Sequence, residues 1–250
     1  MPEKPILVAS NNVLIVSNLR KSLSRKPIVR NVSLKLERGK TIGLLGPNGA
    51  GKTTTFYMIM GLIKADAGEI KLDKIDITSL PMYKRARLGI GYLPQQPSIF
   101  RGLSVEDNIL SILETKKYHS DQKQTILEDL LTEFSLTHLR RAMPYMLSGG
   151  ERRRTEIARC LCSNPNFILM DEPTAGVDPI GINDIKTLIR QLMRKDIGIL
   201  ITDHNVREVL DICDYSYVMH SGEIIAEGES SQILGNKEAK RFYLGDTFKY

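Results

Sequence analysis

The chain has 250 residues with 35 basic and 29 acidic side chains, which give a net charge of +6. This length suits one domain with its own core, and the interspersed charges favour a mixed, solvated surface over nucleic-acid binding. Cys160, Cys162 and Cys213 form no CxxC pair, which indicates a reducing compartment and argues against disulfides and structural zinc. The apolar runs are shorter than the roughly 18 residues that a membrane span requires, so we expect a soluble protein.

Short β-type runs mark the beginning of the chain. Residues 1–12 are expected to be a flexible N-terminal tail, and residues 13–250 a single domain. Alternating or β-branched runs at 13–16, 28–36 and 68–77 predict an antiparallel β subdomain.

A second kind of strand is continuously apolar. Such runs occur at Thr41–Leu45, 167–170 and 199–202, and they are typical of strands buried on both faces. Helical patterns separate these strands, so the fold class is predicted to be α/β with a mostly parallel sheet. Residues 230–250 are expected to form a C-terminal extension.

Residues 102–160 are predicted to form a helical subdomain. Ser104 with Asp107, and Asp121 with Gln124, match the capping-box pattern that starts a helix. The second helix carries an apolar stripe on one face. The stripe consists of Ile126, Leu127, Leu130, Leu131 and Phe134.

A glycine-rich segment joins the Thr41–Leu45 strand to a predicted helix, which is the context of a phosphate-binding loop. Its expected nucleotide-binding residues are Gly46, Pro47, Asn48, Gly49, Ala50, Gly51, Lys52, Thr53 and Thr54. The glycines let backbone N–H groups approach phosphates, and the helix adds its positive end. Lys52 is expected to reach the β- and γ-phosphates, and the Thr53 hydroxyl to bind Mg²⁺. The alternative is an ordinary glycine turn.

Two carboxylates, Asp171 and Glu172, end the buried strand at 167–170. Ligands of α/β sheets bind at the carboxyl ends of strands, and successive side chains point to opposite sides. We therefore expect Asp171 to support Mg²⁺ and Glu172 to act as the general base toward water. His204 follows another buried strand and should emerge at the same edge, near the γ-phosphate.

The sequence LSGGE at residues 147–151 opens a further helix. Ser148, Gly149 and Gly150 are small enough to let backbone donors contact a phosphate of another chain. Three arginines, at 152–154, follow at the positive end of that helix, where cations are unfavourable. They predict an anion or an acidic neighbour, and the alternative is that they are solvated.

The phosphate loop, LSGGE and the strand ending in Asp171-Glu172 together resemble the ATP-binding-cassette family. This resemblance implies a head-to-tail homodimer in which the signature of one copy closes over ATP and Mg²⁺ held by the other. It also assigns Gln95 to a nucleotide- and Mg²⁺-binding glutamine loop, and His204 to a catalytic switch. The loop after the catalytic acid maps to Gly176, Val177 and Asp178.

Longer segments resemble the ATPase subunits of lipopolysaccharide export transporters, among them GYLPQQPSIFRGLSVEDN, LSGGERRRTEIAR, ITDHNVRE and RFYLGDTF. That resemblance implies LptF- and LptG-type permease subunits and an LptC-type accessory protein, with docking at Phe100 and Arg101. It places the chain on the cytoplasmic face of the inner membrane. Because a related YLG ending occurs in branched-chain amino-acid importer ATPases, those importers are the alternative.

Cassette proteins of translation or chromosome maintenance form a different class. The first kind carries two cassettes in one chain, and the second inserts a long coiled coil between phosphate loop and signature. This chain has one copy of each motif and only the short segment 102–146 between them. The sequence therefore favours a transporter motor without a nucleic-acid partner.

One position departs from the family pattern. Leu23 stands where the resemblance places an aromatic residue that stacks on adenine, and residues 13–38 contain no aromatic side chain. Stacking of a base on an aromatic ring is worth about 1–3 kcal/mol. We therefore expect weaker base binding, and better competition by GTP, than in a relative that carries tyrosine there.

Overall fold

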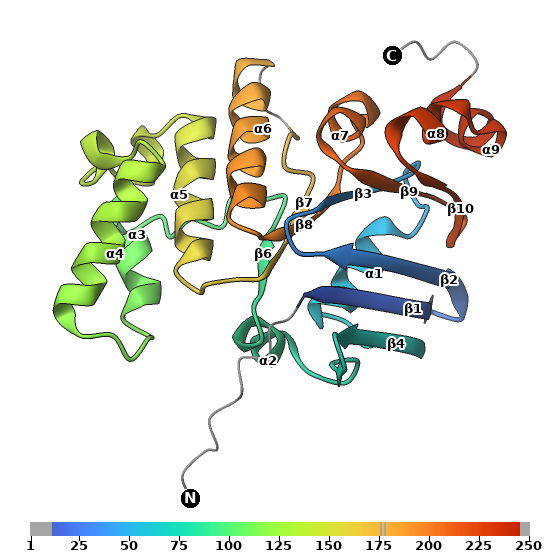
Figure 1. Ribbon diagram of the computed structural model, residues 1–250, viewed down its shortest axis with the longest axis horizontal. Coiled ribbons are helices and arrows are strands. Elements are labelled where there is room, and N and C mark those ends of the chain that lie inside the picture. The colour runs from blue at the N-terminus through green and yellow to red at the C-terminus, as the bar shows by residue number, and fades with distance from the viewer. Residues whose placement is uncertain (1–11, 176, 178, 246–250) are drawn as a thin grey trace, which may run out of the picture.

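A computed structural model describes residues 12–175, 177 and 179–245. In these residues ten strands form one mixed sheet with the order β5-β4-β1-β2-β10-β9-β3-β8-β7-β6 (Figure 1). Of the expected tail at 1–12, residues 1–11 lie outside the described residues. Asn12 is attached to the domain, because its backbone N–H donates to the Asp73 carboxylate at 3.0 and 3.1 Å.

The antiparallel subdomain expected from the sequence is present at one end of the sheet. It comprises β1 (Val13–Leu23), β2 (Lys26–Glu37), β4 (Ala67–Leu72) and β5 (Ile75–Asp76). β1 and β2 extend beyond the predicted runs because they form a long hairpin whose far end is polar and exposed. One parallel pairing, Glu223 with Asn31, joins this subdomain to the rest of the sheet.

The expected buried strands form the parallel part of the sheet. β3 (Thr41–Leu45) pairs in parallel with β8 (Gly198–Thr202) and with β9 (Tyr215–His220). β7 (Phe167–Asp171) lies between β8 and β6 (Ile90–Leu93), and both pairings are parallel. β10 (Glu223–Gly228) returns antiparallel to β9.

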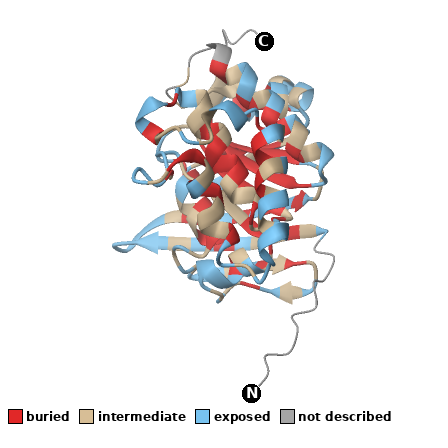
Figure 2. Cartoon of the chain, turned by 90° about the vertical axis from the view of Figure 1, so that its left-hand side faces the viewer, coloured by how far each residue is buried: buried red, intermediate tan, exposed pale blue. Residues whose placement is uncertain are grey.

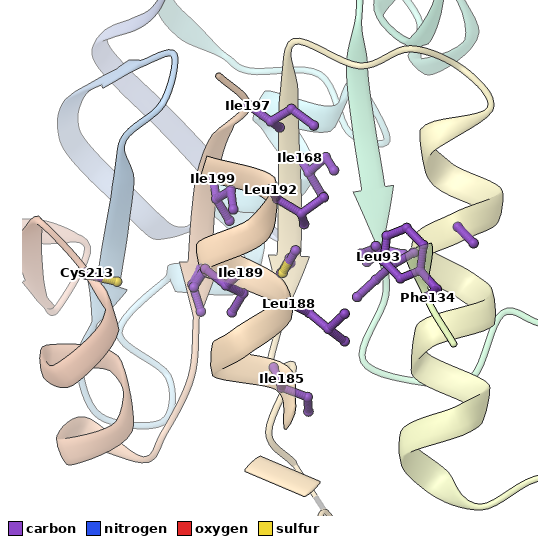
Figure 3. Packing of buried hydrophobic residues seen from close by; sticks show 14 of the residues in the cluster. Leu93, Phe134, Ile168, Ile185, Leu188, Ile189, Leu192, Ile197, Ile199 and Cys213 are labelled. Atoms are coloured by element: carbon purple, nitrogen blue, oxygen red, sulfur yellow. The ribbon is translucent and has the colours of Figure 1, made fainter. Parts of the chain in front are cut away.

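Helices cover both faces of the parallel strands. α1 (Lys52–Met60) packs on the face that carries Phe167 and Leu169, whereas α6 (Pro179–Arg194) packs on the face that carries Ile168 and Met170. Side chains from α6 point toward β7 and β8 in Figure 3. Burial of both faces explains why β3, β7 and β8 are continuously apolar (Figure 2).

The helical subdomain lies at one end of the molecule (Figure 1) and contains α3 (Val105–Leu113), α4 (Ser120–Glu133) and α5 (Gly149–Leu161). Ser104 caps α3 as predicted, since its Oγ accepts from the Asp107 N–H at 3.2 Å. The predicted start at Asp121 and Gln124 was wrong. α4 begins after His119, whose backbone N–H donates to Gln122 Oε1 at 3.0 Å.

Shorter elements complete the chain. They are α2 (Met82–Arg87), the 3₁₀ turns η1 (Thr137–Leu139) and η2 (Pro144–Met146), α7 (Val206–Ile212), α8 (Ser230–Gly235), α9 (Lys237–Ala239) and the π-helical η3 (Lys240–Leu244). The expected C-terminal extension thus consists of α8, α9 and η3 as far as residue 245. No helix in the described ranges has the length and apolar character to cross a membrane.

Candidate functional site

The phosphate-binding loop connects β3 to α1, as its sequence context predicts. Gly46 has φ +143°, and a Cβ there would lie 2.2 Å from the Met219 carbonyl oxygen. Gly51 has φ +103°, and a Cβ there would lie 2.8 Å from the Ile28 carbonyl oxygen. Only glycine fits both the backbone angles and these close approaches, so the loop conformation follows from these two residues.

Lys52 begins α1 and is largely buried under the loop. Its Nζ donates to the carbonyl oxygens of Gly46, at 2.6 Å, and Pro47, at 3.0 Å. Burial lowers the pKa of Lys52, and the nearby Glu172 and Asp171 carboxylates oppose that shift. The ammonium group is thus held within the loop, where it would meet an anionic ligand.

A hollow opens in front of the loop. The loop and the first turn of α1 form one wall, and the β1–β2 hairpin, which includes Leu23, forms the other. Its lining residues are Leu23, Lys26, Pro27, Ile28, Arg30, Asn48, Gly49, Ala50, Gly51, Lys52, Thr53, Thr54, Glu172 and Ser221. The hollow therefore brings most of the expected nucleotide-binding residues together with the expected base, and its cationic side chains suit a phosphate ligand.

Asp171 and Glu172 lie at the carboxyl end of β7, and their environments differ. Asp171 is buried and its Oδ1 accepts from Thr202 Oγ1 at 2.6 Å. Glu172 has φ +43°, a left-handed conformation that is uncommon outside glycine, and its N–H donates to the Thr202 carbonyl at 2.8 Å. Glu172 thus lies beyond the extended strand, and its left-handed backbone, which the alternation of side chains along a strand does not predict, helps to set its direction relative to Asp171.

Gln95 and His204 converge on Glu172. Gln95 Nε2 donates to Glu172 Oε2 at 2.8 Å, and His204 Nδ1 lies 3.4 Å from the same oxygen. The histidine side chain is exposed, so it faces the open side of the site. Three segments far apart in sequence therefore meet at one carboxylate.

The residues expected to hold Mg²⁺ are chemically suited to it. Mg²⁺ prefers oxygen ligands, and Thr53 offers a hydroxyl on the wall of the hollow. Asp171 has a second carboxylate oxygen beyond the one bonded to Thr202. Because the Gln95 amide nitrogen is the atom bonded to Glu172, its carbonyl oxygen is left for a metal ion.

Sequence reasoning did not identify Asp203, which is fully buried beside His204. Its carboxylate accepts from Thr174 Oγ1 at 2.5 Å and from the Asn205 N–H at 2.9 Å, and its Oδ1 lies 3.5 Å from His204 Nδ1. Asp203 therefore fixes the loop that carries the histidine. Its position directly after a buried strand was the available signal.

Tyr243 was also not identified. It lies in η3, and its hydroxyl is buried against the backbone of Gly46 at the start of the phosphate loop. Burial raises the pKa of Tyr243 to about 12, and the Asp203 charge acts in the same direction. The C-terminal extension thus reaches the phosphate loop.

The LSGGE segment starts α5 and does not contribute to the lining of the hollow. Ser148 caps the helix: its Oγ accepts from the Glu151 N–H at 3.3 Å, and its own N–H donates to Glu151 Oε2 at 2.7 Å. Ser148 and Gly149 are exposed, so this helix start faces outward.

Two of the arginines at 152–154 have the acidic neighbours that their position predicted. Arg153 bonds Glu156 at 3.2 Å, and Arg154 bonds Asp184 at 3.3 Å. The hydrogen bonds from Ser148 also lower the pKa of Glu151, which keeps a negative charge at the positive helix end.

Phe100 and Arg101 lie on the surface after β6. Phe100 is 47% exposed, and the Arg159 guanidinium lies 4.6 Å from its ring centroid. Arg159 also lines a groove whose other residues are Met60, Met82, Ala86, Ile90, Gly91, Tyr92, Leu93, Ile112, Glu156, Cys160 and Ser163. Phe100 thus borders a largely apolar groove. Of the loop after the catalytic acid, Gly176 and Asp178 lie outside the described residues.

Comparison with known proteins decides the family. Residues 29–175 match the family model described as ABC transporter. The chain belongs to this family. An uncharacterized ABC transporter ATP-binding protein of Rhizobium meliloti is 54% identical, covering 95% of this chain and 88% of that protein. The lipopolysaccharide export system ATP-binding protein LptB of Haemophilus influenzae is 50% identical, covering 95% of this chain and 99% of that protein.

A solved structure supports the same family assignment. The ADP conformation of an ATP-binding cassette of an ABC transporter superposes with a TM-score of 0.84 at 30% identity, covering 94% of this chain and 99% of that chain. The fold and family predicted from the motifs are confirmed. The chain is an ABC transporter ATPase.

Proposed function

We propose that this ABC transporter ATPase is the motor subunit of a lipopolysaccharide export transporter. The observation that carries this assignment is the 50% identity to LptB of Haemophilus influenzae, which extends over nearly the full length of both chains. The predicted alternative, a branched-chain amino-acid importer, was based on the shared YLG ending of the chain. The near full-length similarity to LptB outweighs that short segment.

The site supports hydrolysis with Glu172 as general base. Lys52 and the loop N–H groups bind the β- and γ-phosphates of ATP, and Glu172 at the edge of the same hollow accepts a proton from the attacking water. His204 and Gln95 position the carboxylate, since both approach its Oε2. Thr53, Asp171 and Gln95 would hold Mg²⁺, which would supply positive charge to neutralise the phosphates.

A head-to-tail homodimer completes the site. Ser148, Gly149 and Gly150 are absent from the lining of the chain's own hollow, and the first two are exposed at a helix start. An exposed helix N-terminus favours an anion. We therefore assign these residues to the γ-phosphate of ATP bound by a second copy, so that ATP closes the dimer and hydrolysis opens it.

The membrane partners are proposed to dock at the apolar groove beside Arg159. Its residues come from α1, α2, β6, α3, α5 and the turn after α5, so the groove links the nucleotide-binding core to the helical subdomain. Phe100 and Arg101 lie next to it on the segment that starts with Gln95. A shift of Gln95 on nucleotide binding would thus be transmitted to the docked permeases. By similarity to LptB these are LptF- and LptG-type subunits, which bind an LptC-type accessory protein. We accordingly propose that the chain lies on the cytoplasmic face of the inner membrane.

Co-purification tests the assignment. A tagged Glu172→Gln variant is trapped with ATP in its native membranes, and the proteins bound to it are identified by mass spectrometry. Permease subunits with large periplasmic β-rich domains support lipopolysaccharide export. Amino-acid permease subunits, or ribosomal or DNA-bound partners, contradict it. A second variant of this chain, which adds Phe100→Ala to Glu172→Gln, tests the docking site. It should no longer co-purify with the permeases but should still bind ATP.

A further inference from the structure

The nucleotide hollow has no aromatic side chain among its lining residues. Leu23, at the position where a base would stack, is 46% exposed at the end of β1. Pro27 and Ile28 add further aliphatic contacts on the same wall. One face of a bound base would therefore meet aliphatic groups, and nothing in the described lining supplies a ring for the other face.

The surface just before the LSGGE segment, in contrast to the hollow, carries an exposed aromatic side chain. Tyr145 is 81% exposed and Met146 is 65% exposed, the highest values among the large apolar side chains in the described ranges. They form the η2 turn directly before Leu147, which is buried and anchors the segment to the core. An exposed tyrosine beside an exposed methionine on an anchored turn is a surface suited to a flat, apolar partner.

Tyr145 lies three residues before Ser148, the helix cap assigned above to the γ-phosphate. Leu147 and Ser148 have extended backbone angles, with φ −87°, ψ 141° and φ −62°, ψ 165°. Tyr145 and Met146 lie in the η2 turn, so the three residues from Tyr145 to Ser148 span less than the roughly 10 Å of a fully extended chain, and the tyrosine side chain adds to that reach. If Ser148 contacts the γ-phosphate, Tyr145 lies within reach of the base at the other end of the same triphosphate.

We propose that Tyr145 of one copy stacks on the base of the ATP held by the phosphate loop of the second copy, with Met146 beside it. The proposal rests on the head-to-tail dimer proposed above. Leu23 then contacts the base in the open chain, and the tyrosine covers it only when the dimer closes. Base stacking thereby becomes part of the ATP-driven closure. Because every base has a π-face, Tyr145 strengthens closure without selecting one base strictly.

A single-tryptophan variant tests this contact, since the chain contains no tryptophan. In a Glu172→Gln background, the fluorescence of the indole introduced by Tyr145→Trp is followed during ATP titration, and dimer formation is measured in parallel by analytical ultracentrifugation. Fluorescence that changes together with dimerisation supports the proposal. Dimerisation without any change in fluorescence overturns it.

Truncation supplies the second measurement. Tyr145→Ala should raise the ATP concentration for half-maximal dimerisation about five- to hundred-fold, and Tyr145→Phe should leave it nearly unchanged. The matched control is Tyr118→Ala, an exposed tyrosine of the helical subdomain. The loss on Tyr145→Ala should be larger with ATP than with UTP, whose ring offers less stacking area.

The outcomes separate the two proposals. Equal losses with ATP and UTP mean that the tyrosine contacts protein, and no loss means that it contacts nothing; both overturn the stacking proposal and leave the dimer intact. A Glu172→Gln protein that stays monomeric at saturating ATP overturns the dimer, and the stacking contact with it.

Discussion

Gln95 Nε2 donates a hydrogen bond to Glu172 Oε2 across 2.8 Å. The same oxygen is approached by His204 Nδ1 at 3.4 Å. The carboxylate therefore has a defined orientation before any water or nucleotide contacts it. Because Gln95 leads into the segment that borders the apolar groove, this contact joins the proposed base to the proposed docking surface.

Replacing Glu172 by glutamine should lower ATP turnover by about a hundredfold or more, the usual effect of losing a general base. The amide has the same size and can adopt the same left-handed backbone, so ATP binding should persist. Phosphate release and equilibrium nucleotide binding measure the two effects separately. Near-normal turnover in the variant would remove Glu172 from its role.

His204→Ala should lower turnover by about tenfold to a hundredfold with little change in KM, because the side chain approaches Glu172 without lining the hollow. Steady-state kinetics give both parameters. His119→Ala is the matched control, since His119 is an exposed histidine of the helical subdomain. A rise in KM with unchanged kcat would show that His204 contributes to binding instead.

The grouping of most candidate site residues was predictable because these residues lie in short segments with local signals. The glycines of the phosphate loop and the acids after β7 are local signals, and strand direction alone brings Glu172 and His204 to one edge. Asp203 carries only the signal of its position directly after β8, and Tyr243 carries no local signal. Their roles depend on contacts across the fold, and Tyr243 lies almost 200 residues after the loop that it touches.

The errors of the sequence reasoning have local causes. The start of α4 offers two overlapping patterns, and Gln122 accepts from the N–H of His119 while Gln124 bonds Glu128 on the helix surface. A capping box is defined by spacing, and spacing alone does not choose between two glutamines. Similarly, β1 extends into the polar residues before Leu23 because hairpin pairing with β2 replaces the missing apolar pattern.

Leu192→Ala should destabilise the protein by about 2–5 kcal/mol, the range for a large-to-small change in a core. Leu192 is fully buried, and α6 uses it with Ile185, Leu188 and Ile189 to cover β7 and β8 (Figure 3). Denaturant unfolding measures the loss. Leu192→Met, which nearly conserves volume, should lose less than about 1.5 kcal/mol. Equal losses in the two variants would contradict a tightly packed site.

Tyr243 gives a prediction about alkaline pH. Burial raises the pKa of Tyr243 to about 12 from an ordinary 10.0, so the native state retains the proton longer than the unfolded chain. Stability from this group is therefore complete below pH 10.0 and is lost as pH rises toward 12. The slope is at most about 1.4 kcal/mol per pH unit for one proton.

Tyr243→Phe removes that proton and should flatten the fall of unfolding free energy at alkaline pH. Urea unfolding between neutral pH and pH 11 measures the difference between the two proteins. Other buried tyrosines, such as Tyr92 with its raised pKa, are present in both proteins. Their contributions therefore cancel in the difference between the two unfolding free energies. Parallel curves would show that the Tyr243 hydroxyl is solvated in the native state.

Leu23→Tyr should tighten ATP binding to the open chain, because it places a ring on the aliphatic wall of the hollow. The expected gain is about 1–3 kcal/mol, the range for stacking a base on an aromatic side chain. Nucleotide titration of the monomer measures it, and a parallel titration with GTP tests the expectation from the sequence that GTP competes less well when a tyrosine occupies this position. Leu23→Ile is the control, since it keeps an aliphatic contact and should leave affinity nearly unchanged. A native chain that already prefers ATP strongly over GTP would show that other residues of the hollow read the base, and Leu23 would lose its proposed place beside it.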